Sequence, residues 1–329
     1  MRMMVSFTGR GVRYPAPDVA RGFMLLLVAV ANVPVWNKAL AGIDGTSRAT
    51  AADAWWVFVR ALFVDHRAYP LFAMLFGFGL MTMINRRVVS GTRAYLESLP
   101  GVEAGREPTP QEEAWARGRA TVDARRLVRR RGLWMILFGA VHGTIFAGDI
   151  IGAYGIIATI FAGTIVERKR VRMLVAGLLI TAVGVYSMVS MGLATAETAD
   201  AASAATDVVS ASDTALRPIG LDYFPNSFVQ WAGTAVITVL TSMALPAALL
   251  GARLAETSLL ARPDRHRRAL LIGGAAALAV GALGALPYMK LGAPTWMIVM
   301  EPVLNSLTGL VGACGWLALL AAWAGPGTN

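Results

Sequence analysis

A histidine and an aspartate stand within one of the most apolar stretches of this sequence. His142 lies eleven residues after Arg131 and seven residues before Asp149. At 100° per residue, these offsets return to within about 20° of one helix face. Ionisable groups are expensive in hydrocarbon, so they usually face a bundle interior or a wet cavity. A neutral imidazole that a carboxylate orients is the arrangement that a general base needs.

The residue types around His142 leave several roles open. A proton carrier, a general base, a metal ligand and a structural hydrogen-bonding group all fit. Metal binding is disfavoured, because the sequence has three histidines and lacks His-Cys and His-x-x-x-His spacings. In a continuous helix Asp149 would lie about 10 Å beyond His142, so direct contact requires a helix break at Gly148, or else a substrate lies between them. Gly139 and Gly143 form a small-xxx-small pair that admits a neighbouring helix.

The elements that must position these side chains are apolar helices. The 329 residues are 56% hydrophobic and 15% charged, whereas a soluble domain is roughly 25% charged. Long apolar runs separated by arginine clusters predict an all-α, polytopic helical membrane protein, with residues 1–329 as one integral membrane domain. About eight spans are expected, near 19–37, 68–85, 132–148, 150–166, 172–191, 228–253, 269–288 and 295–323.

Basic residues gather in alternate connections between these spans. Residues 86–131 hold eleven arginines, and further clusters lie at 167–172 and 253–268. The positive-inside rule therefore places both termini in the cytoplasm and puts His142 and Asp149 toward the outer side. Because the net charge of +10 lies at span ends, it indicates topology, and we expect no nucleic-acid binding.

Other segments carry weaker signals. Residues 53–64 predict an interfacial or re-entrant helix, and 86–131 predicts a basic cytoplasmic loop whose part from 111 is amphipathic. The composition of 192–227 favours a flexible outer loop. Pro246 predicts a kink in the sixth span. Glu301 is expected to cap a helix that begins at Pro302, the alternative being a buried catalytic or ion-coupling carboxylate.

Polar residues also open the first span. Asp18 and Arg21 are three residues apart and can pair on a helix surface, and Asn32 shares the face of Arg21. In the structural interpretation, Asp18 caps the helix, Arg21 marks the cytoplasmic interface and Asn32 bonds a neighbouring helix. The functional alternative is that they line a substrate site.

The second span begins with Asp65, His66 and Arg67. One interpretation is an anchor at the membrane interface. The other is a cationic and imidazole cluster that faces the same outer cavity as His142.

Taken together, three motifs resemble those of the YeiB-like family, bacterial integral membrane proteins of unknown function. They are Asp18-x-x-Arg21-Gly22 with Asn32, then Arg67-x-Tyr69-x-Leu71-Phe72-x-x-Leu75-Phe76-Gly77-x-Gly79, and then Arg130-Arg131 with Gly139-x-x-His142 and Gly148-Asp149-Ile150-x-x-x-Tyr154. The resemblance covers nearly the whole chain. It implies a multi-pass protein of the bacterial plasma (inner) membrane.

The opening helices of that family are similar to transmembrane acyltransferases such as the heparan glucosaminide acetyltransferase. The resemblance implies transfer of an acyl group from a cytoplasmic thioester donor, such as acyl-CoA, to a small, glycan or lipid acceptor on the far side. It implies no covalently bound cofactor. Family members usually continue through further helices, so the chain resembles the front portion of a longer protein.

A second departure concerns Asn32, which stands where many related sugar acyltransferases carry a histidine. A nucleophile-activating role cannot be carried onto an asparagine. We therefore expect His142 to deprotonate the acceptor, with Asp149 orienting it. Substrate contacts are expected from a further set of residues, in which the arginines stabilise anionic charge: Asp18, Arg21, Asn32, His66, Arg67 and Tyr154. The rival interpretation is a small-solute transporter or a non-enzymatic subunit that scaffolds a protein partner or further copies of itself.

Overall fold

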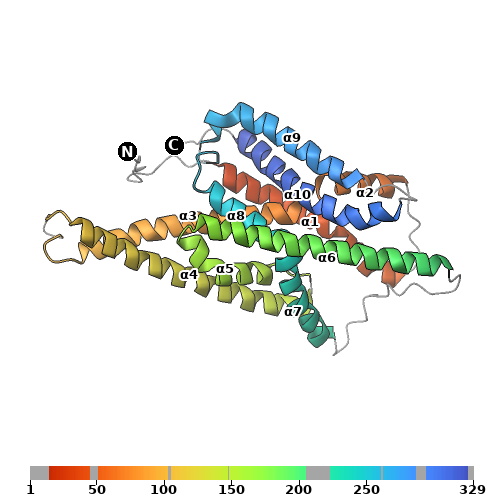
Figure 1. Cartoon of the computed structure of the whole chain (residues 1–329), viewed down its shortest axis with the longest axis horizontal. Coiled ribbons are helices and arrows are strands. Elements are labelled where there is room, and N and C mark those ends of the chain that lie inside the picture. The colour runs from red at the N-terminus through yellow and green to blue at the C-terminus, as the bar shows by residue number, and fades with distance from the viewer. Residues whose placement is uncertain are drawn as a thin grey trace.

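The computed structural model describes residues 15–44, 51–102, 105–146, 148–204, 223–260, 262–286 and 294–324. Within these ranges the secondary structure is entirely helical, as the sequence predicts, and most helices run along the long direction of the molecule (Figure 1). The elements are α1 (Ala16–Asp44), α2 (Ala51–Phe63), α3 (Ala68–Glu97), α4 (Pro110–Ile145), α5 (Ile151–Val166), α6 (Arg170–Ala204), α7 (Tyr223–Thr241), α8 (Ala244–Leu254), the 3-10 helix η1 (Pro263–His266), α9 (Arg267–Ala285) and α10 (Thr295–Ala324).

Five helical stretches of the described chain are long and apolar enough to cross a membrane, and the count is six if the bent pair α7–α8 is one span. The expected count of eight is not confirmed. It included the apolar part of α4, residues 132–145, and the 16-residue α5. Both are shorter than the roughly 20 residues that a spanning helix needs. The five stretches are Ala16–Val33, Ala51–Glu97, Arg170–Ala194, Pro263–Ala285 and Val299–Ala324.

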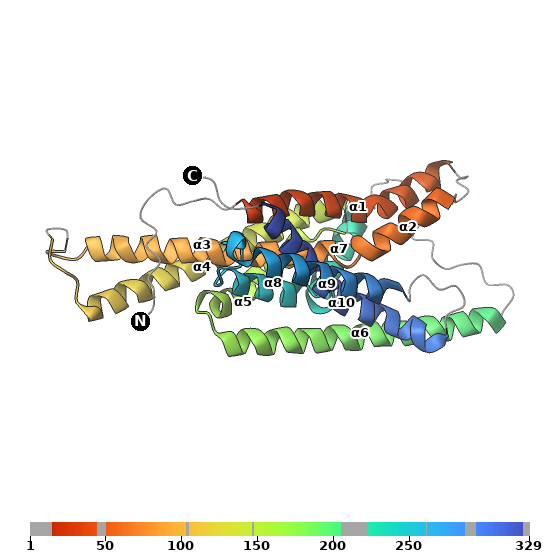
Figure 2. The same cartoon turned by 90° about the horizontal axis from the view of Figure 1, so that it is seen from above.

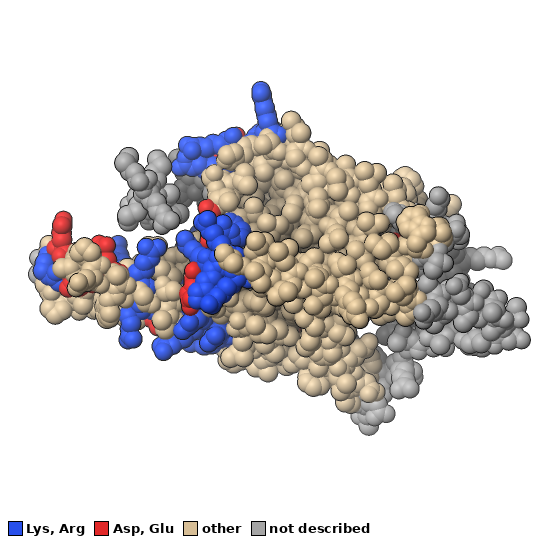
Figure 3. Space-filling view, viewed as in Figure 1, with Lys and Arg blue, Asp and Glu red and all other residues tan. Residues whose placement is uncertain are grey.

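Lysine and arginine side chains gather at one end of the molecule, and the other described residues on the visible face carry little charge (Figure 3). The basic segment 86–131 is mostly helical rather than a loop, because α3 continues to Glu97 and α4 begins at Pro110. These two helices extend beyond the bundle as a hairpin (Figures 1 and 2). The turn between α5 and α6 and the start of α9 lie on the same side, so the three basic connections share one end.

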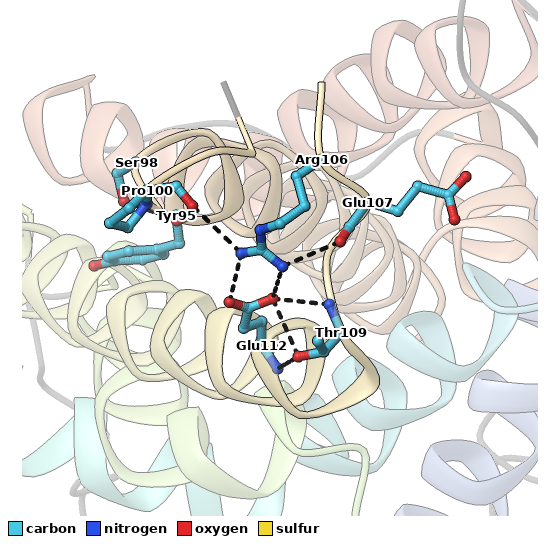
Figure 4. A network of polar contacts seen from close by, with 7 residues as sticks. All are labelled: Tyr95, Ser98, Pro100, Arg106, Glu107, Thr109 and Glu112. Carbon is cyan, nitrogen blue, oxygen red and sulfur yellow. Dashed lines mark hydrogen bonds and ion pairs between the residues drawn. The ribbon is translucent and has the colours of Figure 1, made fainter. Parts of the chain in front are cut away.

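The tip of this hairpin is held by a capping box at the start of α4. Thr109 accepts a hydrogen bond from the backbone N–H of Glu112, and the Glu112 carboxylate accepts one from the backbone N–H of Thr109 at 2.8 Å. Arg106 donates to both carboxylate oxygens of Glu112, at 2.8 and 3.1 Å (Figure 4). The Arg106 guanidinium, followed by the Thr109 N–H, lowers the pKa of Glu112 to about 2.

This cap should weaken in acid. Because the folded pKa of Glu112 is depressed, its contribution is complete above the ordinary value of 4.5 and is lost as the pH falls toward 2. We expect hydrogen-exchange protection in the first turn of α4, corrected for intrinsic rates, to fall over that interval. Glu112→Gln should show reduced protection already at pH 7, whereas Glu113→Gln, its exposed neighbour, should behave as the wild type. Equal protection in the two variants would contradict the assignment.

The central helix α3 crosses α8 at very short range. A Cβ atom added to Gly77 would lie 1.9 Å from the carbonyl oxygen of Ala248, and one added to Gly251 would lie 1.9 Å from that of Met74. The two glycines are therefore reciprocal: each gives room to the backbone of the other helix. Small residues allow this approach, which brings the two helices into close van der Waals contact.

Substitution at this crossing should be destabilising. Gly77→Ala forces two backbones apart, and we expect it to lower the free energy of unfolding by about 1–3 kcal/mol, the usual cost of overpacking. Gly273→Ala is the matched control, because no atom lies within 4 Å of its added Cβ. Thermal unfolding in detergent micelles measures both, and the prediction is wrong if they melt alike.

Several local expectations need correction. The kink expected at Pro246 is a break of 58° between α7 and α8, before the proline, with Met243 at φ 58°. Pro246 then lies in the first turn of α8, where its missing N–H has no helical acceptor to lose.

The cap expected at Glu301 is also wrong, since α10 begins at Thr295 and continues through Pro302. A proline removes one helical hydrogen bond, and a long apolar helix with well-packed neighbours tolerates that loss. The expected outer loop at 192–227 is shorter than predicted: α6 extends to Ala204 and α7 begins at Tyr223, and residues 205–222 lie outside the described ranges.

Candidate functional site

The sequence allowed either a helix break at Gly148 or a substrate between His142 and Asp149, and the structure has a helix break, which begins at Phe146. Helix α4 ends at Ile145, Phe146 is extended with φ −137° and ψ 100°, and α5 begins at Ile151. The chain reverses here, so that α5 packs back along α4. As a result, Nδ1 of His142 lies 2.9 Å from Oδ1 of Asp149, and the two side chains are in direct contact.

Asp149 joins three helices. Its side chain is 1% exposed, and its second oxygen accepts hydrogen bonds from the backbone N–H of Gly152 at 2.9 Å and from Nε1 of Trp231 at 3.1 Å. The bond to Gly152 covers an N–H at the start of α5. The carboxylate therefore accepts donors from α4, α5 and α7, and its buried oxygens are satisfied.

The imidazole of His142 is open on its other side. Its side chain is 50% exposed, in contrast to the buried carboxylate. Because a carboxylate can only accept, the neutral ring carries its proton on Nδ1 and its lone pair on Nε2. Among the described residues, Nε2 has no hydrogen-bond partner. This is the geometry of a base held in one tautomer, with its basic nitrogen accessible.

The glycine pair beside His142 admits two helices rather than one. A Cβ atom on Gly139 would lie 2.5 Å from the backbone nitrogen of Gly152 in α5. One on Gly143 would lie 2.2 Å from the ring of Trp231 in α7. The predicted close approach at this pair is therefore confirmed, and it places α5 and α7 around Asp149.

Sequence reasoning missed Trp231 as part of this site. The residue is 6% exposed and donates to a carboxylate 82 positions earlier in the chain. Its position near the start of an apolar run is typical of an interface anchor. Only its buried indole N–H, which needs an acceptor, signals another role.

A second group of polar residues surrounds a cavity of about 430 Å³. His66 lines this cavity, and its Nδ1 lies 3.3 Å from Oγ of Ser306. Neither His142 nor Asp149 lines it. The structure therefore places the two histidines in different surroundings, whereas the sequence allowed one shared cavity.

Arg67 does not face this cavity. It is fully buried, and it donates to the carbonyls of Ala61, Asp65 and Gly281 and to Oδ1 of Asn305. Its guanidinium thus holds together the α2–α3 turn, α9 and α10. Arg67 therefore has a structural role, whereas the sequence predicted that it binds an anionic substrate.

The remaining predicted site residues fall into two places. Asp18 and Arg21 form an ion pair of 2.9 Å in the first turns of α1, both partly exposed. Deeper in, Asn32 accepts a hydrogen bond from Tyr69 at 3.3 Å, and Tyr154 donates to the carbonyl of Tyr69 at 3.3 Å. Asn32 and Tyr154 thus meet at Tyr69, which lines the cavity.

No family model, curated protein or solved structure matches this chain. Within the described residues, no group of three or more His, Cys, Asp or Glu side chains is placed to hold a metal ion.

Removal of the Asp149 carboxylate should destabilise the protein. Asp149→Ala leaves the indole of Trp231 and the N–H of Gly152 buried without an acceptor, and each such group costs about 1–3 kcal/mol. Asp149→Asn keeps one acceptor oxygen and should lose less. Thermal unfolding in micelles compares both with Asp264→Ala, which removes an exposed carboxylate. If Asp149→Ala melts like Asp264→Ala, the carboxylate does not hold the three helices together.

Proposed function

We propose that this protein is a membrane acyltransferase, with the hydrogen-bonded pair His142 and Asp149 at its catalytic centre. The observation that carries the proposal is the half-exposed imidazole, which a fully buried carboxylate holds in one tautomer. The choice of acyl transfer rests on the resemblance of the motifs to the YeiB-like family and to transmembrane acyltransferases. The donor is a cytoplasmic thioester such as acyl-CoA, and the acceptor is a small molecule, glycan or lipid.

In this reaction Nε2 of His142 takes the proton from a hydroxyl or amine of the acceptor. The acceptor atom then attacks the thioester carbonyl, and the carbon–sulfur bond breaks. The departing thiolate receives the proton back from the imidazolium, so protons balance over the cycle. Asp149 stabilises the imidazolium while it exists, as a buried carboxylate does beside a catalytic histidine.

The basic end of the molecule supports an orientation with both termini in the cytoplasm of a bacterial cell, in the inner membrane. With Arg131 at the cytoplasmic boundary, eleven residues of helix bring His142 to a depth of about 16 Å. The hydrocarbon core is about 30 Å thick, so a helix perpendicular to the membrane brings His142 near its middle, deeper than the outer-side position that the sequence predicted. The proposed reaction then takes place inside the bundle, at a depth that the extended arm of a thioester donor has to reach.

The arginines divide into different roles in this proposal. The exposed arginines of 86–131, together with Arg21, attract the anionic groups of the donor to the basic end. Arg67 is assigned no contact with donor or acceptor, since its two terminal nitrogens donate to carbonyls and to Asn305, and its Nε, which has no partner, is buried.

A small-solute transporter is the second candidate. The observation that favours it is the 58° break between α7 and α8, because discontinuous helices often border transport sites. In the described residues this is the single broken pair, whereas transporters with inverted repeats usually carry two.

The test is transfer of label from radioactive acetyl-CoA, supplied at the cytoplasmic face of membrane vesicles, to lipid, glycan and soluble fractions. His142→Ala should lower this transfer by at least about 100-fold, the usual contribution of a general base, while membrane insertion and expression are unchanged. His266→Ala removes the histidine of the basic turn and should retain wild-type activity. Unchanged transfer in His142→Ala would rule out the proposed base.

A further inference from the structure

The cavity beside His66 is a candidate binding site that the proposed reaction does not use. It lies where α1, the α2–α3 turn, α6, α7 and α10 meet. Its volume of about 430 Å³ is within the usual range for small-molecule sites, roughly 300–1,000 Å³. Apolar side chains form part of its wall, and a few polar groups converge on it, as such sites typically show.

Three hydroxyl groups of the cavity wall donate their protons in hydrogen bonds within the protein. Tyr69 donates to Oδ1 of Asn32, Ser242 donates to the carbonyl of Thr238, and Thr241 donates to that of Ile237. Each oxygen keeps lone pairs that can accept. The wall therefore presents hydrogen-bond acceptors, which suit a ligand rich in O–H donors.

The imidazole of His66 adds a ring nitrogen that can donate or accept a hydrogen bond, depending on the tautomer. Its Nδ1 is engaged with Ser306, and its Nε2 has no partner among the described residues. The residue has φ 59°, in the left-handed region that side chains other than glycine rarely adopt. Ser242 lines the cavity, and the next residue in the chain, Met243, has φ 58°. Such strained residues cluster at functional sites.

The packing of α10 keeps His66 in this conformation. A Cβ atom added to Gly309 would lie 2.4 Å from the carbonyl oxygen of His66 and 2.9 Å from its Cβ. The helix thus lies directly against the strained turn, and Ser306, one turn earlier on α10, meets the imidazole. This part of the cavity wall is therefore preformed.

The charged side chains nearest the cavity are already bonded to other protein groups. Asp65 pairs with Arg60 at 2.9 Å. Arg67, behind the wall, donates to Asn305, whose amide in turn donates to Glu301 at 3.2 Å. Arg60 and Asp65 thus form an ion pair, and Arg67 and Glu301 bind the same amide side chain, that of Asn305. A charged ligand would lose its hydration here without gaining a countercharge, so the site favours a neutral ligand.

We propose that this cavity binds a small neutral molecule with several hydroxyl groups, a polyol or monosaccharide. Its hydroxyls donate to Tyr69, Thr241 and Ser242, and one of them bonds Nε2 of His66. This inference is independent of acyl transfer, because binding requires neither His142 nor a thioester.

Saturation-transfer NMR on the full chain in lipid nanodiscs tests the proposal, with glycerol, myo-inositol and D-glucose as probes. At least one should bind saturably, and glucose 6-phosphate and choline should bind at least tenfold more weakly. Absence of saturable binding by all three neutral probes would overturn the proposal. Tighter binding of either charged probe would do the same.

Two variants locate the binding. Ser242→Leu places an apolar side chain in the cavity and should weaken binding at least tenfold, whereas Ser190→Leu, at an exposed position on α6, should not. Tyr69→Phe removes one acceptor with little change of shape and should weaken binding about fivefold. Thermal unfolding verifies that each variant is folded. If Ser242→Leu does not fold, the affinity of Tyr69→Phe alone tests where the ligand binds. Wild-type affinity in the folded variants would place the binding elsewhere.

Discussion

A buried guanidinium sets the arrangement of half of this bundle. Arg67 is 0% exposed, and a cation removed from water is stable only where enough acceptors surround it. The acceptors come from α2, the turn after it, α9 and α10. Gly281 lets α9 and α10 approach closely, since a Cβ atom on it would lie 2.8 Å from Cα of Gly312, and Gly312 leaves room for Arg67, whose Cγ would lie 3.1 Å from an added Cβ. The position of α10 against the α2–α3 turn, and with it the wall of the cavity, depends on this arrangement.

The other half of the bundle has a comparable centre of opposite charge. Asp149 is a buried carboxylate whose donors come from α4, α5 and α7. Both centres follow from the same rule, that a charge in an apolar interior requires a nearly complete set of hydrogen bonds. They differ in what remains open. Arg67 is enclosed, whereas Asp149 holds an imidazole whose far nitrogen is accessible.

A short chain of aromatic and amide side chains lies between the two centres. Tyr154 follows Asp149 by five residues and donates to the carbonyl of Tyr69, which follows Arg67 by two and donates to Asn32. The ring of Tyr154 also stacks on Phe72, with 4.8 Å between centroids. The proposed catalytic pair and the cavity are therefore separate, but the same packed residues position both of them.

The sequence by itself determined the helical class, the apolar character of the long helices and the clustering of basic residues at their ends, because composition and charge placement depend on local chemistry alone. It also predicted that His142 and Asp149 share one helix face, and that their contact needs a break at Gly148 or else a substrate between them; the structure has a break, which begins at Phe146. Its count of eight spans is not confirmed, since α4 ends at Ile145 and α5 has 16 residues. Only the tertiary structure decided that Trp231 completes the carboxylate site, that Arg67 is enclosed and that His66 faces Ser306. Each of these depends on a partner at least 82 positions away in the chain, and no local pattern encodes which distant donor meets which acceptor.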